Sequence, residues 1–240
     1  MRQAFAVCVG IARRIPETIM VREGFYNRIK ELERDVLHMG EFVIEAINRS
    51  VEALAELDAK QAKRVMDDDA QVNQQRWALE EKCIDLIARQ QPVASDLREI
   101  MSMLSIVRDL ERIGDYAEGI GKIVLLHGDQ PLVRPLIYLP QMTEKAISML
   151  RRSLDAFVKR DAGLAQQICL EDDEVDRLYD QAYHDLLKHM IEDPTLITRA
   201  TYLIWAAHNI ERIADRATNI AESGVYLVTG TPVELNVSRY

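Results

Sequence analysis

One stretch of this chain occurs twice, and the duplication constrains the fold more than any other feature. Asp109-Leu-Glu-Arg-Ile-Gly-Asp115 reappears as Asn209-Ile-Glu-Arg-Ile-Ala-Asp215, with every residue displaced by the same interval. Upstream, a second series of matches keeps one register: Met39, Glu41, Ser50, Glu52, Asp58, Asp69 and Val72 pair with Met142, Glu144, Ser153, Asp155, Asp161, Asp172 and Val175. Chance similarity between helices would not produce two such series of matches, each with a constant interval, so the sequence predicts two related units.

Apolar residues recur every three or four positions along most of the chain, which is the pattern of amphipathic helices. Glycine and proline are sparse, as in a nearly all-helical protein. We expect a first helix at about 22–57 and a second at about 59–89. A third follows the break at Pro92 and ends near 126. A fourth spans about 136–159, a fifth ends near 191, and a sixth runs from Asp193-Pro194 to about 228. Short connections make successive helices antiparallel neighbours. The predicted fold is all-α, with two tandem, pseudo-symmetric three-helix bundles.

The boundaries follow from the breaks in this pattern. Three prolines gather between His127 and Pro140, which marks the segment as a linker. Two arginines follow the short apolar run near the N-terminus, an order that does not fit a signal peptide. We therefore divide the chain into a possible non-core extension (1–19), a first repeat (20–128), a linker (129–140), a second repeat (141–230) and a tail (231–240).

Composition excludes several classes of function. The formal net charge of -9 lacks the basic footprint of a protein that binds duplex nucleic acid. The three cysteines are far apart and form neither a metal-spaced pair nor a disulfide framework, which indicates a reducing, cytoplasmic setting. The sequence also lacks an apolar run long enough for a transmembrane helix.

The duplicated motif places two acids one helical turn apart on the same face, Glu111 with Asp115 and Glu211 with Asp215. Such pairs repel each other, so a bound cation would offset their repulsion. The alternative is a solvated face whose charge is neutralised by nearby arginines, namely Arg108, Arg112, Arg212 and Arg216. The appearance of the pair in both copies favours the cation.

Antiparallel packing brings a second acidic pair level with each motif. Residues equally far from a connecting turn face each other, and helix axes about 8–10 Å apart let their side chains converge. The candidate metal ligands are therefore Asp69, Asn73, Glu111 and Asp115 in the first half, and Asp172, Asp176, Glu211 and Asp215 in the second. Oxygen donors of this kind suit Mg, Mn or Fe and tolerate Zn. Asn73 is neutral, so we expect the second site to bind more strongly.

The two motifs also carry a family resemblance. Arg108-Asp-Leu-Glu-Arg-Ile-Gly-Asp115 with the following Tyr116-Ala-Glu118, the second copy His208-Asn-Ile-Glu-Arg-Ile-Ala-Asp215, and Gln91-Pro-Val-Ala-Ser-Asp-Leu-Arg98 resemble the PhoU family of phosphate regulators. The resemblance covers nearly the whole chain from Met20. It implies paired three-helix bundles with pseudo-twofold symmetry, and in some members multinuclear iron or zinc clusters on the Glu/Asp-x-x-x-Asp motifs.

The resemblance further implies a non-enzymatic regulator that couples the ATPase subunit of the phosphate ABC transporter to the phosphate-sensing histidine kinase. Such a protein keeps the starvation response off when phosphate is plentiful, acts at the cytoplasmic face of the membrane through its partners, and forms a homodimer. The sequence shows no Gly-rich phosphate loop and no nucleophile–base constellation, so we assign no catalytic residues. The alternative from another class is a carboxylate-bridged metalloenzyme, an oxidase or phosphohydrolase.

Overall fold

The computed structural model describes residues 17–133 and 137–235. The described part contains six long α-helices and one short 3-10 helix, and no strand. Their bounds are α1 Glu17–Glu56, α2 Ala59–Gln90, α3 Ser95–His127, α4 Tyr138–Lys159, α5 Ala162–Glu192, η1 Pro194–Leu196 and α6 Ile197–Thr229. The predicted all-α class is confirmed. Most of the predicted extension (1–19) and the end of the predicted tail lie outside the described residues.

Capping side chains set several of these boundaries. The carboxylate of Asp58 accepts hydrogen bonds from the backbone N–H groups of Lys60 and Gln61 at 2.8 and 3.1 Å, and so begins α2. Asp161 occupies the matching position in the second half and accepts from the Leu164 N–H at 2.9 Å. Gly128, with a φ of 65°, follows the last residue of α3.

Two boundaries differ from the prediction. Asp193 does cap a helix, but the residues after it first form the 3-10 turn η1, and α6 begins only at Ile197. The Asp193 carboxylate accepts from the Thr195 N–H at 2.9 Å, which fixes this tighter turn. At the other end of the chain, α1 begins at Glu17 rather than near Arg22.

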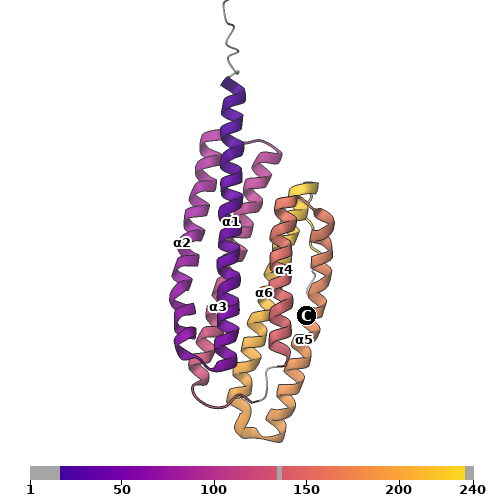
Figure 1. Ribbon diagram of the computed structural model, residues 1–240. Helices are drawn as coiled ribbons and strands as arrows, with labels where there is room; N and C mark the ends of the chain where they lie inside the picture. Colours follow the sequence, from indigo (N-terminus) through magenta and orange to yellow (C-terminus); the bar gives the residue numbers. More distant parts are fainter. Residues whose placement is uncertain (1–16, 134–136, 236–240) are drawn as a thin grey trace, which may run out of the picture.

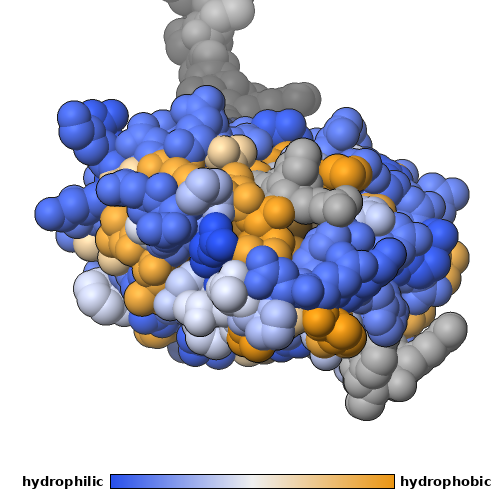
Figure 2. Space-filling view, turned by 90° about the horizontal axis from the view of Figure 1, so that it is seen from below, coloured by the Kyte–Doolittle hydropathy of each residue, from blue (hydrophilic) through white to orange (hydrophobic). Residues whose placement is uncertain are grey.

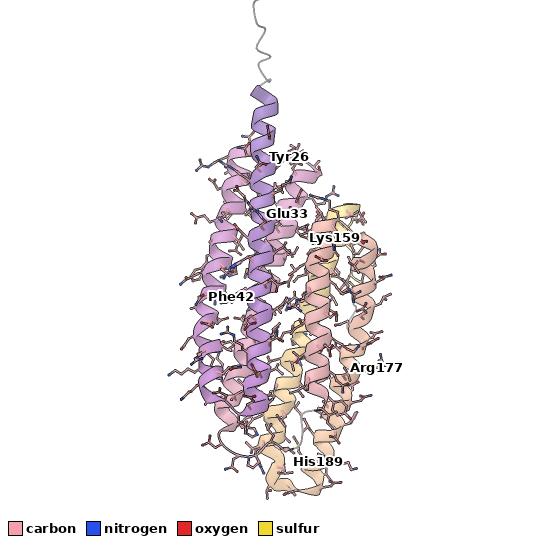
Figure 3. The ribbon with its side chains drawn as sticks, viewed as in Figure 1. Tyr26, Glu33, Phe42, Lys159, Arg177 and His189 are labelled. Atoms are coloured by element: carbon pink, nitrogen blue, oxygen red, sulfur yellow. The ribbon has the colours of Figure 1, made fainter. Side chains whose placement is uncertain are left out.

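The helices form two three-helix groups that lie side by side along one long axis, α1–α3 on one side and α4–α6 on the other (Figure 1). Helix α3 packs extensively on α6, and α1 contacts α4, so these four helices form the boundary between the halves. Figure 3 shows Glu33 on α1 near the end of α4, where Lys159 lies. One hydrophobic cluster, with residues from all six helices, runs through both halves.

The repeat is visible in the core as well as in the motifs. Met39 and Met142 are fully buried at matching positions of α1 and α4, and Leu110 and Ile210 are fully buried at matching positions of α3 and α6. Ser50 and Ser153 are buried too, each with its hydroxyl donating to a backbone carbonyl. Residues at matching positions are therefore buried in both bundles, although Ser50 donates to Ile47 of its own helix and Ser153 donates to Ala217 of α6.

Several apolar side chains are exposed to solvent at one end of the molecule. Seen from the end where α5 turns into α6, orange apolar residues lie among hydrophilic ones in several patches (Figure 2). Large apolar side chains with about half or more of their surface exposed come from the helix termini at this end, namely Leu126, Ile137, Ile191 and Ile197. The chain crosses from the first half to the second at this same end.

Candidate metal centres

The first acidic cluster lies between α2 and α3, at the register expected from the sequence. Asp69 of α2 has its pKa raised to about 6, by burial first and then by the negative charges of Asp115, Glu118 and Glu111 on α3. The Asn73 side-chain amide donates to the Asp69 carboxylate at 2.9 Å. The four predicted residues of the first half are thus neighbours.

Close packing of the helices leaves one carboxylate oxygen of this cluster exposed to neither water nor protein donors. Asp69 Oδ1 is buried and has no hydrogen-bond partner among the described residues. Gly114 on α3 allows the close approach, because a Cβ there would lie 3.0 Å from Val72 and 3.4 Å from Asp69 Oδ1. A buried oxygen without a hydrogen-bond donor costs free energy. A cation bound at this oxygen would therefore stabilise the cluster.

The second cluster lies between α5 and α6. Burial, followed by the charges of Asp215, Asp176 and Asp172, raises the pKa of Glu211 to about 7. Burial and the charge of Asp215 also raise the pKa of Asp176. Asp172 is only 2% exposed. The four predicted residues of the second half therefore interact with one another across the two helices.

Arginines neutralise part of this charge, as the alternative interpretation of the sequence required. Arg112 lies 3.0 Å from Asp115, and Arg212 lies 2.8 Å from Asp215. The other two arginines named in that interpretation pair elsewhere: Arg108 with Glu80 at 3.2 Å, and Arg216 with Asp109 at 3.3 Å. Each motif thus has one acid with its own arginine one turn away.

His208 lies at the edge of the second cluster. Its Nδ1 is 3.2 Å from Glu211 Oε2, and its ring centroid is 6.0 Å from that of Tyr179. Burial, and then the charge of Arg212, lower the pKa of His208, so the imidazole is neutral at neutral pH. A neutral imidazole beside Glu211 adds no positive charge to the cluster.

Sequence reasoning missed two participants in the first cluster. Glu118 lies one turn beyond Asp115 on α3, and its charge raises the pKa of Asp69. Its spacing from Glu111 and Asp115 places it on the same helix face, and this spacing could have identified it. Arg76 of α2 lies with its Nε 3.6 Å from Glu111 Oε1. No pattern within one helix indicates that contact, because it depends on the packing of α2 on α3.

The donor chemistry of both clusters fits a hard divalent cation. Carboxylate oxygens dominate each. Burial first, and then repulsion among the acids, raises the pKa values of Asp69 and Glu211, and a bound cation would lower them again. Among the described residues, however, no three Asp, Glu, His or Cys side chains already converge on one point. An ion would draw the acids together by side-chain rotation, and would replace the arginine at Asp115 or Asp215.

A polar network connects the second cluster to the boundary between the halves. Tyr116 of α3 interacts with the side chains of both Arg212 and Arg216 of α6 and raises the pKa of both guanidinium groups. Arg212 in turn pairs with Asp215, and Arg216 pairs with the buried Asp109. A change in the pairing of Asp215 therefore acts directly on a contact between the two bundles.

No helix in the described ranges is both long and apolar enough to cross a lipid bilayer. The two candidate sites lie on charged, partly buried faces, one between α2 and α3 and one between α5 and α6.

Comparison with known proteins agrees with this architecture. The PhoU domain family model matches residues 36–124 and again 139–224, one match in each bundle. A Pseudomonas putida protein named phosphate-specific transport system accessory protein PhoU homolog is 38% identical over 216 residues, which are 89% of this chain and 84% of that protein. A Clostridium acetobutylicum protein of the same name is 38% identical over 90% of this chain and its own full length.

Solved structures give the same result. The crystal structure of PhoU from Pseudomonas aeruginosa superposes with a TM-score of 0.82 at 38% identity, covering 86% of this chain and all of that one. The structure of the phosphate transport system regulatory protein PhoU from Streptococcus pneumoniae also gives 0.82, at 34% identity, over 88% of this chain and all of that one. The chain belongs to the PhoU family.

Proposed function

We propose that this protein is a non-enzymatic regulator of phosphate transport that couples the phosphate ABC transporter to the phosphate-sensing histidine kinase. The observation that carries the proposal is the match of both bundles to the PhoU domain, over most of the length of relatives named as transport accessory proteins. The regulator holds the phosphate-starvation response off when phosphate is plentiful. It acts at the cytoplasmic face of the membrane through its partners, as a homodimer.

The site supports binding rather than turnover. A catalytic metal needs an open coordination position in a shaped pocket that excludes water. Here the motif acids lie along helix faces, and Asp115 and Asp215 are each paired with an arginine of the same helix. Such a site suits an ion that changes how the helices are held together.

The acids of the second half would hold that ion. The set Asp172, Asp176, Glu211 and Asp215 offers the oxygen donors that Mg, Mn, Fe or Zn accepts. The ion would supply positive charge to a cluster in which burial, and then repulsion from the neighbouring acids, raises the pKa of Glu211 to about 7. Arg212 would then be freed from Asp215, while its interaction with Tyr116 keeps it at the boundary between the bundles.

Charge supports protein partners over nucleic acid. The net charge of -9 favours encounter with a basic surface, and this attraction is screened within about 8 Å at physiological ionic strength. Association with the cytoplasmic part of the kinase, or with the transporter ATPase, should therefore slow as salt rises, whereas dissociation should change less. Association rates measured in low and high salt test this.

Deleting the gene tests the proposal as a whole. In phosphate-rich medium, the deletion strain should express phosphate-scavenging genes that the parent keeps off, and a plasmid copy should restore repression. Unchanged repression in the deletion strain would overturn the regulatory role. If purified protein loaded with Fe, Mn or Zn turned over phosphoesters or peroxide, the protein would instead be an enzyme.

A further inference from the structure

We propose that Glu33, Glu99 and Arg160 form a proton-sensitive clasp, which holds the turn between α4 and α5 against the first bundle and releases it when Glu33 loses its proton. The clasp lies at the end of the molecule away from the linker, where Figure 3 shows Glu33 of α1 near the end of α4. It is a conformational device that depends neither on the acidic motifs nor on the proposed regulatory function.

Arg160 connects the second bundle to the first. It follows the last residue of α4, and its Nη2 atom lies 2.7 Å from Oε1 of Glu99 on α3 and 3.9 Å from Oε1 of Glu33 on α1. The Glu99 side chain is only 8% exposed, and that of Glu33 is 16% exposed. One guanidinium from the second bundle is therefore shared by two largely buried carboxyl groups of the first.

This arrangement is balanced only when one of the two acids is neutral. Burial, and then the negative charge of Glu99, raise the pKa of Glu33, whereas the positive charges of Arg160 and Lys30 oppose the shift. With Glu33 protonated, one carboxylate faces one guanidinium. With Glu33 ionised, two buried carboxylates repel each other beside a single cation, and this repulsion is relieved when Arg160 and its turn move towards water.

A cavity leaves room for that movement. It has a volume of about 530 Å³ and lies between α1 and the end of α4. Its lining includes the charged residues Lys30, Glu31, Glu33 and Arg34 of α1, and Val158 of α4. Farther along the same pair of helices, a Cβ at Gly40 of α1 would collide with the Leu154 side chain of α4, so the two helices are in close contact there. The contact at Leu154 confines the movement to the last turn of α4 and the connection that follows it.

The repeat shows that the connection itself does not require an arginine. Leu57 precedes the capping Asp58 as Arg160 precedes the capping Asp161, and both Leu57 and Arg160 have a left-handed backbone with a φ of 55°. An apolar residue therefore closes the same turn in the first half. The guanidinium at position 160 is explained by its contacts with Glu99 and Glu33, and not by the local backbone.

A second contact at this end joins the bundles without a carboxyl group. Arg98 of α3 donates to the Leu227 carbonyl of α6 at 3.4 Å, and its guanidinium carbon lies 5.9 Å from the centre of the Tyr226 ring. A guanidinium stays charged at any physiological pH. The end of α6 should therefore remain on α3 when the clasp opens, and it provides an internal reference.

Hydrogen exchange of the full-length protein, measured by mass spectrometry at about pH 5 and about pH 7.5 and corrected for the intrinsic rates, tests the clasp. The amides of residues 156–164 include the N–H groups of Arg160 and Asp161, which donate to carbonyls of the last turn of α4. A raised pKa stabilises the closed clasp at low pH, and this stabilisation is lost as pH rises through the pKa of Glu33. The protection of these amides should therefore be at least about threefold lower at the higher pH, while residues 224–230 keep theirs.

Three variants show whether Glu33 is the group that titrates. Glu33→Gln cannot ionise and should keep the turn protected at both pH values. Glu31→Gln removes a charge from an exposed position two residues away and should behave as the wild type. Arg160→Gln should lower the protection of the turn at both pH values, and circular dichroism checks that each variant keeps its helices.

A pH-dependent loss of protection that persists in Glu33→Gln would overturn the clasp. Equal protection of the wild-type turn at the two pH values, or unaltered protection in Arg160→Gln, would overturn it as well. All three results would leave the proposed regulatory function standing, because that function rests on the family and not on these residues.

Discussion

Arg216 of α6 lies with its Nη1 3.3 Å from Oδ1 of Asp109 on α3, and this ion pair joins the two bundles across their most extensive contact. Asp109 is 8% exposed, and Asn219 of α6 also donates to it at 3.4 Å. Burial raises the pKa of Asp109, while the Asn219 hydrogen bond and the Arg216 charge oppose the shift. The two halves are therefore held together by charge as well as by the continuous apolar core.

Breaking this pair should destabilise the whole protein. Asp109→Ala leaves the half-buried Arg216 without its carboxylate, and we expect a loss of about 3 kcal/mol in the free energy of unfolding. Asp129→Ala, at an exposed position, should cost less than about 0.5 kcal/mol. Urea denaturation measures both changes. A double-mutant cycle with Arg216→Ala should show coupling above about 1 kcal/mol, and purely additive losses would contradict the contact.

The two aspartate N-caps, Asp58 and Asp161, should contribute similar amounts to the free energy of unfolding. Asp58→Ala and Asp161→Ala each remove the carboxylate that accepts backbone N–H groups at the start of α2 and α5. Each should cost about 1 kcal/mol of unfolding free energy, since this is the usual effect of losing an aspartate cap. Asp→Asn at the same positions keeps an acceptor and serves as the control. A loss confined to one half would show that the repeat is not equivalent here.

The raised pKa of Glu211 predicts a pH-dependent gain of stability on mutation. The folded state holds the proton up to about pH 7, whereas the carboxyl loses it near 4.5 when unfolded. The cost of burying the charge is therefore absent below about pH 4.5, grows between pH 4.5 and 7, and is complete above. At about 1.4 kcal/mol per pKa unit, it reaches about 3 kcal/mol.

Glu211→Gln removes that cost. Without added metal, the variant should be more stable than the wild type by about 1–3 kcal/mol at pH 8 and should match it near pH 4.5. Glu144→Gln, at an exposed position of α4, should show no such difference between the two pH values. Chemical denaturation at both pH values decides the matter, and a Glu211→Gln protein that is less stable at pH 8 would contradict the raised pKa.

Much of this structure follows from the sequence, because local chemistry repeats along the chain. The periodic apolar positions located all six helices. The register of an antiparallel pair also brought Asp69 level with the acids of α3, as the charge interactions of Asp69 confirm. Each of these predictions depends on neighbours along one helix or across one short turn.

The contacts between distant segments could not be predicted in the same way. Periodicity shows that one face of α3 is apolar, but it does not show that α6 covers that face. Asp109 and Asn209 occupy matching positions of the repeat, yet Asp109 pairs with Arg216, whereas Asn209 packs against Gly119. Arg76 likewise reaches Glu111 only because α2 lies against α3. The sequence shows that residues differ between the halves, but only the folded chain shows which contacts they make.

The linker should be cleavable without separating the bundles. The chain passes between the halves within residues 128–137, outside the long helices, and proteolysis there should give two fragments of roughly half size on a denaturing gel. Because the apolar core is continuous through both halves, the nicked protein should still elute as one species from a sizing column. Two fragments that elute separately would show that each half has an independent core.

Complementation of the deletion strain tests the link between the second cluster and regulation most directly. A reporter of a phosphate-scavenging gene is measured in phosphate-rich medium, with wild type, Glu211→Gln/Asp215→Asn or Glu111→Gln/Asp115→Asn supplied on a plasmid at equal protein levels. We predict that the second-half variant leaves the reporter on, as in the deletion strain, while the first-half variant restores repression. Full repression by the Glu211→Gln/Asp215→Asn protein would contradict the account.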